Sequence, residues 1–291
     1  MKLDAATIEF GGQPYALMLG EPIDLSWPIS FQSEDASAFS LPGATTKPVE
    51  LGTFIGDTNQ GGSVNCHTLV FTPHGNGTHT EGVGHLLDSH DAVLPSLRGE
   101  FSPALVLTVE TSPLGETADS YAGASEAADS VISAEALRTA RQRLFHGLAR
   151  RTIPSEPFAS NSALIIRTSQ DPAPTRPPQF SSSNPPYFTT EAMELLTSWN
   201  PPHLGTDLPS VDREQCGGRT PNHRLYWKLQ EEHSSGDHAA RRHATITEMI
   251  NPRFDAIDDD AYFVQIHAAP WLSDAVLTRP FLYRFSHLPS S

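Results

Sequence analysis

Short apolar runs recur along the chain, separated by segments rich in proline, glycine and serine. Such runs, when rich in β-branched and aromatic residues, predict strands. Where neighbouring residues of a run are both apolar, we expect a strand that is buried on both of its faces. The runs expected to form strands are residues 54–55, 68–71, 104–109, 163–166 and 262–266.

Helical periodicity marks two longer segments and one shorter one. Ser133 is a suitable N-cap for a helix from residue 134 to about residue 151. Thr189 or Thr190 can cap a second helix over residues 191–199, and a short third helix is expected after Asn222. The apolar stripe of the first helix consists of Leu137, Ala140, Leu144 and Leu148. Strands outnumber helices, so the predicted class is α/β with a substantial mixed sheet.

Two segments lack both patterns and are expected to be irregular. Residues 168–186 contain six prolines and many serines, which predicts a long loop. Residues 233–243 are polar and contain three histidines, and we interpret them as a solvated loop rather than a metal site.

Composition narrows the classes of function. The 291 residues, 38% of them hydrophobic, are enough for a globular protein, and we expect residues 1–291 to form a single domain. No run approaches the roughly 18 apolar residues that span a bilayer, and the N-terminus does not resemble a signal peptide, so a cytoplasmic location is expected. The net charge of −15 argues against nucleic acid and anionic membranes as partners. The expected partners are a small-molecule substrate and further copies of the chain, as in a homodimer.

The two cysteines are far apart in sequence and do not indicate a disulfide framework or a paired zinc site. Cys66 lies in a strand-like run and is expected to be a small buried residue. Cys216 lies in a turn near His223, where a reactive role is an alternative to a structural one.

Three imidazoles and one carboxylate are concentrated between residues 74 and 85. These are groups that bind first-row divalent metals. Four glycines in the segment disfavour a helix, so an extended conformation is expected. In an extended chain His79, Glu81 and His85 share one face, and a turn at residues 75–77 can bring His74 to it. The order of residues does not match the helical His-Glu-x-x-His motif of zinc proteases. We therefore predict a metal site of a different kind.

This segment resembles the His-x-Gly-Thr-His-x-Asp-x3-His signature of the cyclase family of metal-dependent hydrolases, whose best-known members are bacterial kynurenine formamidases. Residues 77–79, Glu81 and His85 match it in register. Two positions depart from the signature. Glu81 stands where the family has aspartate, and the first family histidine would fall at Gly75, whereas the available one is His74.

Three further blocks resemble the family and occur in its order. Residues 24–29 are similar to its N-terminal strand, residues 205–212 and the following His223 to a second block, and residues 246–251 to a third. The resemblance covers most of the chain from about residue 24 onward. It implies an α/β swivelling β/β/α fold with a mixed, strand-rich sheet in a single domain.

The resemblance also implies a ligand set in which His79, Glu81, His223 and Glu248 face one cavity with one or two divalent ions, zinc or manganese. His74 is the candidate for the ligand displaced by one residue. A catalytic ion needs about three protein ligands and an open position for water. Such an ion lowers the pKa of bound water toward about 7 and polarises a carbonyl group.

Other polar residues have two interpretations each. His85 lies beyond the ligand triplet and is the proposed general base or acid, and the alternative is that it orients a ligand. Asp207 and Asp212 suit a turn or a helix cap, and the alternative is that they support a ligand from outside.

The function predicted from these residues is metal-dependent hydrolysis of a carbon–nitrogen bond in an amide, formamide or lactam. Kynurenine formamidase (arylformamidase) and isatin hydrolase activities are what the resemblance implies. The alternatives are a lactone hydrolase, a cyclase of aromatic polyketides, or a metal-binding member without catalysis. Trp27, Phe31, Phe54 and the aromatic residues after Pro186 are expected to line an apolar pocket for an aryl group.

Overall fold

The computed structural model describes residues 4–31, 35–150, 153, 156–159, 161–169, 175–229 and 241–288. Its centre is a mixed sheet in which seven strands close into a barrel, because the last strand of the series pairs with the first. A short strand, β3 (Ile23–Asp24), extends the sheet from β17. The strands of the ring are, in order, β16 (Ala261–Ala268), β9 (Ser102–Val109), β12 (Ala163–Thr168), β14 (His203–Thr206), β15 (Thr245–Glu248), β8 (His79–Glu81) and β17 (Ala275–Tyr283).

The ring has a parallel half and an antiparallel half. Strands β9, β12, β14 and β15 run parallel to one another, whereas β8, β17 and β16 pair antiparallel with their neighbours. Every residue of β12 is buried, and the long strands β9 and β16 are mostly buried too. The expectation of strands buried on both faces is therefore confirmed for residues 104–109, 163–166 and most of 262–266.

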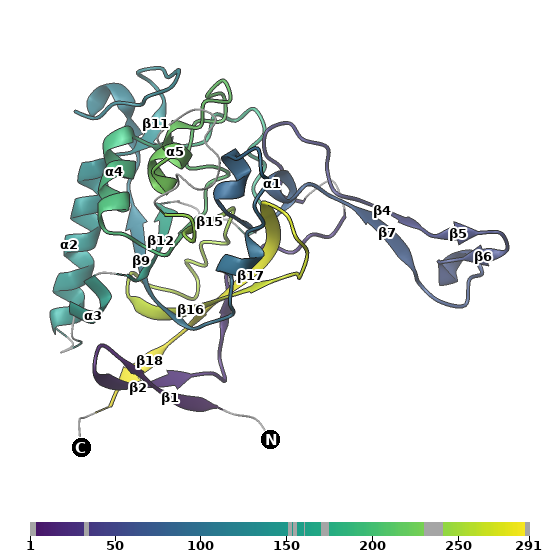
Figure 1. Cartoon of the computed structure of the whole chain (residues 1–291), viewed down its shortest axis with the longest axis horizontal. Helices are drawn as coiled ribbons and strands as arrows, with labels where there is room; N and C mark the ends of the chain where they lie inside the picture. The colour runs from purple at the N-terminus through teal and green to yellow at the C-terminus, as the bar shows by residue number, and fades with distance from the viewer. Residues whose placement is uncertain are drawn as a thin grey trace.

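Helices cover the parallel half of the ring (Figure 1), as parallel strands require crossover connections. Helix α2 (Ala134–Arg150) packs on β9 and on α4 (Thr190–Ser198), and α4 contacts α5 (Pro221–Trp227). The predicted caps are present. Ser133 Oγ accepts a hydrogen bond from the Ala136 amide at 3.2 Å, and Thr189 Oγ1 accepts one from the Ala192 amide at 3.1 Å. The predicted stripe of α2 is buried throughout.

A two-stranded arm projects from the body of the protein (Figure 1). It consists of β4 (Thr45–Pro48) paired with β7 (His67–Val70), and of β5 (Glu50–Leu51) paired with β6 (Phe54–Ile55). All four residues of β7 are exposed, and so is Cys66. Residues 54–55 and 68–71 do form strands, but the expectation that they and Cys66 are buried is wrong. Among the described residues, none covers β7 closely enough to bury it, and a short apolar run does not predict whether a strand will be covered.

Small elements complete the structure. β1 (Ala5–Phe10), β2 (Gln13–Met18) and β18 (Phe285–His287) form a three-stranded sheet, and β10 (Ser112–Pro113), β11 (Ser130–Ile132) and β13 (Tyr187–Phe188) form another. Two helices are short: α1 (Pro73–Asn76) lies between β7 and β8, and α3 (Glu156–Ala159) lies between α2 and β12. Residues 175–186 are irregular, as predicted, and contact the segment around Ser37. The predicted loop at 233–243 lies mostly outside the described residues. Among the described helices, none has the length and apolar character to cross a membrane.

Candidate metal centre

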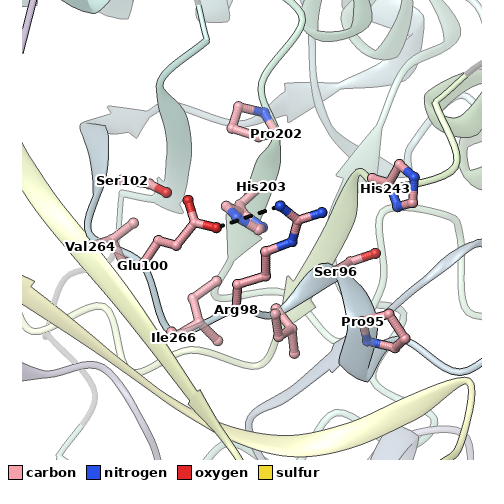
Figure 2. A pocket seen from close by; sticks show the side chains of 12 residues that line it. Pro95, Ser96, Arg98, Glu100, Ser102, Pro202, His203, His243, Val264 and Ile266 are labelled. Atoms are coloured by element: carbon pink, nitrogen blue, oxygen red, sulfur yellow. Dashed lines mark ion pairs between the residues drawn. The ribbon is translucent and has the colours of Figure 1, made fainter.

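Two hollows of similar size differ in their chemistry. One, of about 310 Å³, is lined by residues of β14 and β16 and by the segment 95–102 (Figure 2). Its Arg98 and Glu100 pair with each other at 3.9 Å and are mostly exposed. His203 donates to or accepts from Thr245 Oγ1 at 2.7 Å, and burial lowers its pKa to about 4. A neutral imidazole beside a solvated ion pair is a poor cation site. The other hollow, of about 300 Å³, is lined by five of the six predicted site residues, all except His79: these are His74, Glu81, His85, His223 and Glu248.

The register of β8 places the first two predicted ligands. His79 is paired with Glu248 of β15, and Glu81 is paired with Ala275 of β17. Because side chains alternate along a strand, His79 and Glu81 share one face, as predicted. His79 Nε2 lies 3.5 Å from Glu248 Oε2. The sheet thus brings together residues that are far apart in sequence.

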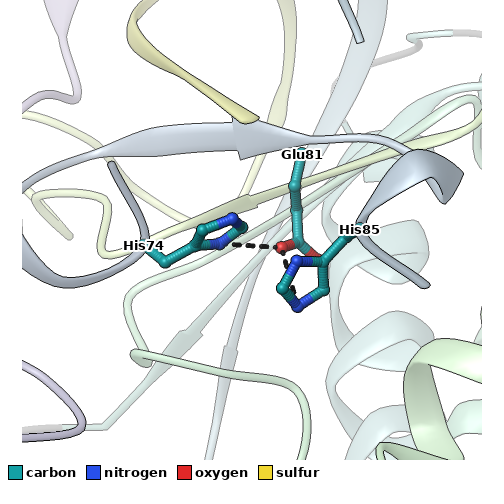
Figure 3. A group of neighbouring side chains, drawn as sticks. All are labelled: His74, Glu81 and His85. Atoms are coloured by element: carbon teal, nitrogen blue, oxygen red, sulfur yellow. Dashed lines mark ion pairs between the residues drawn. The ribbon is translucent and has the colours of Figure 1, made fainter. Parts of the chain in front are cut away.

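His74 and His85 lie on turns at the two ends of β8, so the extended conformation predicted for the whole segment is confirmed only for β8. His74 belongs to the single helical turn α1, and His85 to a 3₁₀ turn at Val83–Leu86. In that turn a Cβ atom at Gly84 would lie 1.9 Å from the carbonyl oxygen of Asp91, so the packing requires glycine. Both imidazoles still face Glu81 (Figure 3): His74 Nδ1 and His85 Nε2 lie 3.2 Å and 3.8 Å from its Oε2.

His223 closes the far side of the cluster from helix α5. Its Nε2 atom lies 3.0 Å from Glu81 Oε1 and 3.6 Å from Glu248 Oε1. The structure therefore brings His74, His79, Glu81, His223 and Glu248 together, with His85 beside them. We call His79, Glu81, His223 and Glu248 the deep layer, because their side chains are at most 3% exposed.

In each imidazole of the deep layer, Nε2 faces the carboxylates and Nδ1 contacts an acceptor outside the cluster. His79 Nδ1 lies 3.0 Å from the carbonyl oxygen of Gly77, and His223 Nδ1 lies 2.6 Å from Asp212 Oδ2. An imidazole that donates one N–H to such an acceptor presents the lone pair of the other nitrogen, which is the usual arrangement of metal-binding histidines.

Asp212 combines the two roles that the sequence left open. Its oxygens accept hydrogen bonds from the backbone amides of Asn222 and His223 at the start of α5, and from Tyr121 Oη at 2.8 Å. It therefore caps the helix and orients the His223 ring. Asp207 accepts hydrogen bonds from the Thr168 amide and hydroxyl, joining the ends of β12 and β14, which is the structural role predicted for it.

Asp274, which directly precedes β17, is the acid that sequence reasoning missed. Its Oδ2 atom lies 3.1 Å from His74 Nε2 and 3.2 Å from His85 Nδ1. It has no motif around it, and only the pairing of β17 with β8 brings it to the site. We call His74, His85 and Asp274 the outer layer, since their side chains are 21–29% exposed.

Three buried polar atoms of the deep layer lack hydrogen-bond partners among the described residues: both carboxylate oxygens of Glu81, and His79 Nε2. The imidazole nitrogens near Glu81 approach it without hydrogen-bond geometry. A buried carboxylate without directed partners is costly, and a cation would satisfy it. Two groups of donor atoms, each within 4.8 Å of one another, share Glu81: His74, Glu81 and His85, and His79, Glu81 and Glu248. The donor set therefore fits one divalent ion, or two that share Glu81.

Charge interactions within the cluster are strong. Burial by itself would lower the pKa of His74, but its contacts with Asp274 and Glu81 raise that pKa to about 10. Burial disfavours the charged form of Glu81, yet the neighbouring His85 and His223 hold its pKa well below the usual range. The pKa of His223 is raised by Glu81 and Asp212 against the effect of burial. Without an ion, the protonated imidazoles of His74 and His223 supply the positive charge that keeps these carboxylates anionic, and a bound divalent ion would replace their protons.

The cavity beside the centre has an apolar wall. Phe39 and Leu41 line it, together with the buried Cys216. The Arg213 guanidinium, also in the wall, is held by Asp129 at 2.9 Å and 3.3 Å. None of the aromatic residues predicted to line an apolar pocket lines this cavity, although two of them line an apolar groove elsewhere. Trp27 and Phe31 line a separate groove of about 500 Å³ near β7, Phe54 lies on the arm, and Tyr187 and Phe188 are buried in the core. These positions could not be told apart from the sequence, because each depends on how segments distant in the chain pack against one another.

Residues 23–213 match the family model described as "Putative cyclase". A search of curated proteins found no significant match. Among solved structures, one described as a potential metal-dependent hydrolase with cyclase activity has a TM-score of 0.53 at 13% identity, covering 91% of this chain and 98% of that one.

Two isatin hydrolases are similar to the same degree. One, bound to the product analogue thioisatinate, has a TM-score of 0.52 at 13% identity and covers 91% of this chain and 93% of its own. Isatin hydrolase A from Labrenzia aggregata, bound to benzyl benzoate, has a TM-score of 0.53 at 14% identity, with 90% and 93% covered. These likenesses confirm the predicted fold. The family match over more than half of the chain establishes that the protein belongs to the cyclase family.

Proposed function

We propose that the protein hydrolyses a carbon–nitrogen bond in a small aryl amide, formamide or lactam, using bound zinc or manganese. The observation that carries this proposal is the pair of buried carboxylates, Glu81 and Glu248, surrounded by four imidazoles at one wall of a cavity. Imidazole and carboxylate together suit these two metals. His74, His79, Glu81, His223 and Glu248 are the proposed ligands.

When bound, the ion supplies Lewis acidity toward a carbonyl group and lowers the pKa of water toward about 7. The residues of the chain position the ion and shape the cavity beside it. The deep layer fixes the position of the charge, because its side chains are held by the sheet and by Asp212. The apolar wall at Phe39 and Leu41 excludes water from the part of the cavity next to the reacting bond.

His85 is the proposed proton carrier. Its Nδ1 contacts Asp274, so its Nε2 faces the centre, and its partial exposure places it in the cavity wall. From there Nε2 can accept a proton from water and deliver it to the leaving nitrogen. Positioned groups of this kind contribute typically about 10²–10⁴-fold to the rate.

The cavity wall supports an aryl substrate. Phe39 and Leu41 offer apolar contact to an aryl ring, whereas the Arg213 guanidinium is already paired with Asp129. Similar structures that are isatin hydrolases support a substrate of the isatin kind, and the formamide is proposed from the sequence resemblance. N-formylkynurenine and isatin are therefore the first substrates to test. The homo-oligomeric state and cytoplasmic location expected from the sequence stay predictions.

The test is elemental analysis of the purified protein, followed by assays with both substrates after metal removal and after addition of zinc or manganese. We expect stoichiometric metal and activity that returns with the ion, and no activity in the metal-free protein. An aryl lactone belongs in the panel, because turnover of the lactone alone would favour a lactone hydrolase. Tight binding of these compounds without any turnover would instead show a non-catalytic member.

A further inference from the structure

We propose that Asp274 is a positioning residue that orients His74 and His85 together, so that one nitrogen of each ring is directed at Glu81. This inference rests on the proposed function, since it assigns His74 to the metal and His85 to proton transfer. Asp274 thereby links metal binding to proton transfer through a single carboxylate oxygen.

The first support is the direction of the two rings. Asp274 Oδ2 lies 3.1 Å from His74 Nε2 and 3.2 Å from His85 Nδ1, and the ring centroids are 4.3 Å apart. The opposite nitrogens, His74 Nδ1 and His85 Nε2, are the ones that face Glu81 Oε2 (Figure 3). A carboxylate oxygen has room for two donated hydrogen bonds, so both rings can donate to Oδ2 at once.

The second support is the set of hydrogen bonds that hold the backbone and the side chain of Asp274 in place. Its carbonyl oxygen accepts the Gly82 amide at 3.0 Å, and the next residue, Ala275, is paired with Glu81 across the sheet. Its other carboxylate oxygen, Oδ1, accepts the Ser273 hydroxyl at 2.9 Å. The carboxylate is therefore fixed relative to Glu81 by the pairing of β17 with β8, the strand that carries His79 and Glu81.

The consequence is a specific tautomer for each ring. An ionised carboxylate only accepts hydrogen bonds, so it holds the proton of His74 on Nε2 and that of His85 on Nδ1. His74 then presents the Nδ1 lone pair to the ion, and His85 presents the Nε2 lone pair to the substrate side. His223 and Asp212 form a similar pair in the deep layer, but there the carboxylate serves one ring only.

The experiment compares wild type, Asp274→Ala and Asp274→Asn as full-length, zinc-loaded proteins. Long-range ¹H–¹⁵N spectra of ¹⁵N-histidine-labelled protein report the tautomer of each ring, with His74→Ala and His85→Ala variants assigning the signals. Competition with a chromophoric chelator gives the zinc dissociation constant. We expect His85 of wild type to carry its proton on Nδ1, and Asp274→Ala to lose this preference and bind zinc about 10–100-fold more weakly.

Ser273→Ala is the matched control, because it removes the bond to Oδ1 and leaves both imidazole contacts in place. It should retain the wild-type tautomers and zinc affinity. Asp274→Asn keeps the shape of the side chain and carries the same test if Asp274→Ala does not fold. Its neutral amide oxygen is a weaker acceptor than a carboxylate oxygen, so the tautomer preference of both rings should weaken.

Two results would overturn the proposal. Unchanged tautomers and zinc affinity in both Asp274 variants would make the contacts incidental. Loss of stoichiometric zinc at saturating metal would make Asp274 a ligand. Both readouts are obtained without substrate, so a protein that binds zinc but hydrolyses none of the panel would refute the proposed function and leave this inference intact.

Discussion

The deep and outer layers of the metal centre differ in how they are held. The deep layer is on sheet strands and on α5, and its side chains are at most 3% exposed. The histidines of the outer layer are on short turns, and its side chains are 21–29% exposed. A buried layer can bind an ion in a fixed geometry, whereas a partly exposed layer can meet substrate and water. We therefore expect deep-layer changes to abolish metal binding, and changes to His85 to alter turnover with the metal retained.

The largest effect is expected for Glu81→Gln, because both candidate donor groups contain Glu81. Loss of a group that only supports a ligand typically costs about 10–100-fold in metal affinity, so loss of the shared carboxylate ligand should cost more than about 100-fold. Zinc titration with a competing chelator should show that loss, and activity should fall to background. A Glu81→Gln protein with full zinc content would remove Glu81 from the centre of the ligand set.

His79→Ala should also lose most of its metal, since it deletes a fully buried ligand opposite Glu248. The measurement is metal content after dialysis, with His267→Ala, an exposed histidine away from the centre, as the control. Full metal occupancy in His79→Ala would show that the ligand assignment is wrong.

His85→Ala tests the outer layer, where we expect an effect on turnover rather than on metal binding. We expect retention of metal and a fall in kcat of about 10²–10⁴-fold, as for a lost general base or acid. Parallel loss of metal and activity would make His85 a ligand, and near-normal kcat would exclude it from proton transfer.

The smallest effect is expected for Asp212→Asn, which leaves every proposed ligand in place but weakens the orientation of His223. Loss of such a supporting carboxylate typically costs about 10–100-fold in metal affinity or activity. Because Asp212 also caps α5, the melting temperature of the metal-free protein should fall as well. An unchanged zinc dissociation constant would leave Asp212 with the capping role alone.

Patterns of apolar residues correctly predicted the helices and strands that pack in the core. The stripe of α2 and the apolar runs of β9 and β12 are buried as expected, because burial requires such patterns. The same kind of run in β7 is exposed on the arm, since position in space is not encoded in a short run. The motif located His79 and Glu81, and the resemblance located His223 and Glu248.

Asp274 and the turns that carry His74 and His85 could not be predicted in this way. The turns are too short to have a periodicity, and Gly84 is required by contact with a backbone segment that only the fold brings near. Asp274 has no local pattern, and its place depends on the register of β17 against β8.

The position of β8 between β15 and β17 has a consequence for how the protein folds. β8 belongs to the first third of the chain, but both of its sheet neighbours lie beyond residue 244. The ring cannot close until the C-terminal strands have been made, and pairing segments so distant in sequence is intrinsically slow. The histidine motif alone is thus not a metal site in a nascent chain. Metal that binds only the native state adds to its stability, so zinc uptake during refolding should coincide with the last step of ring closure.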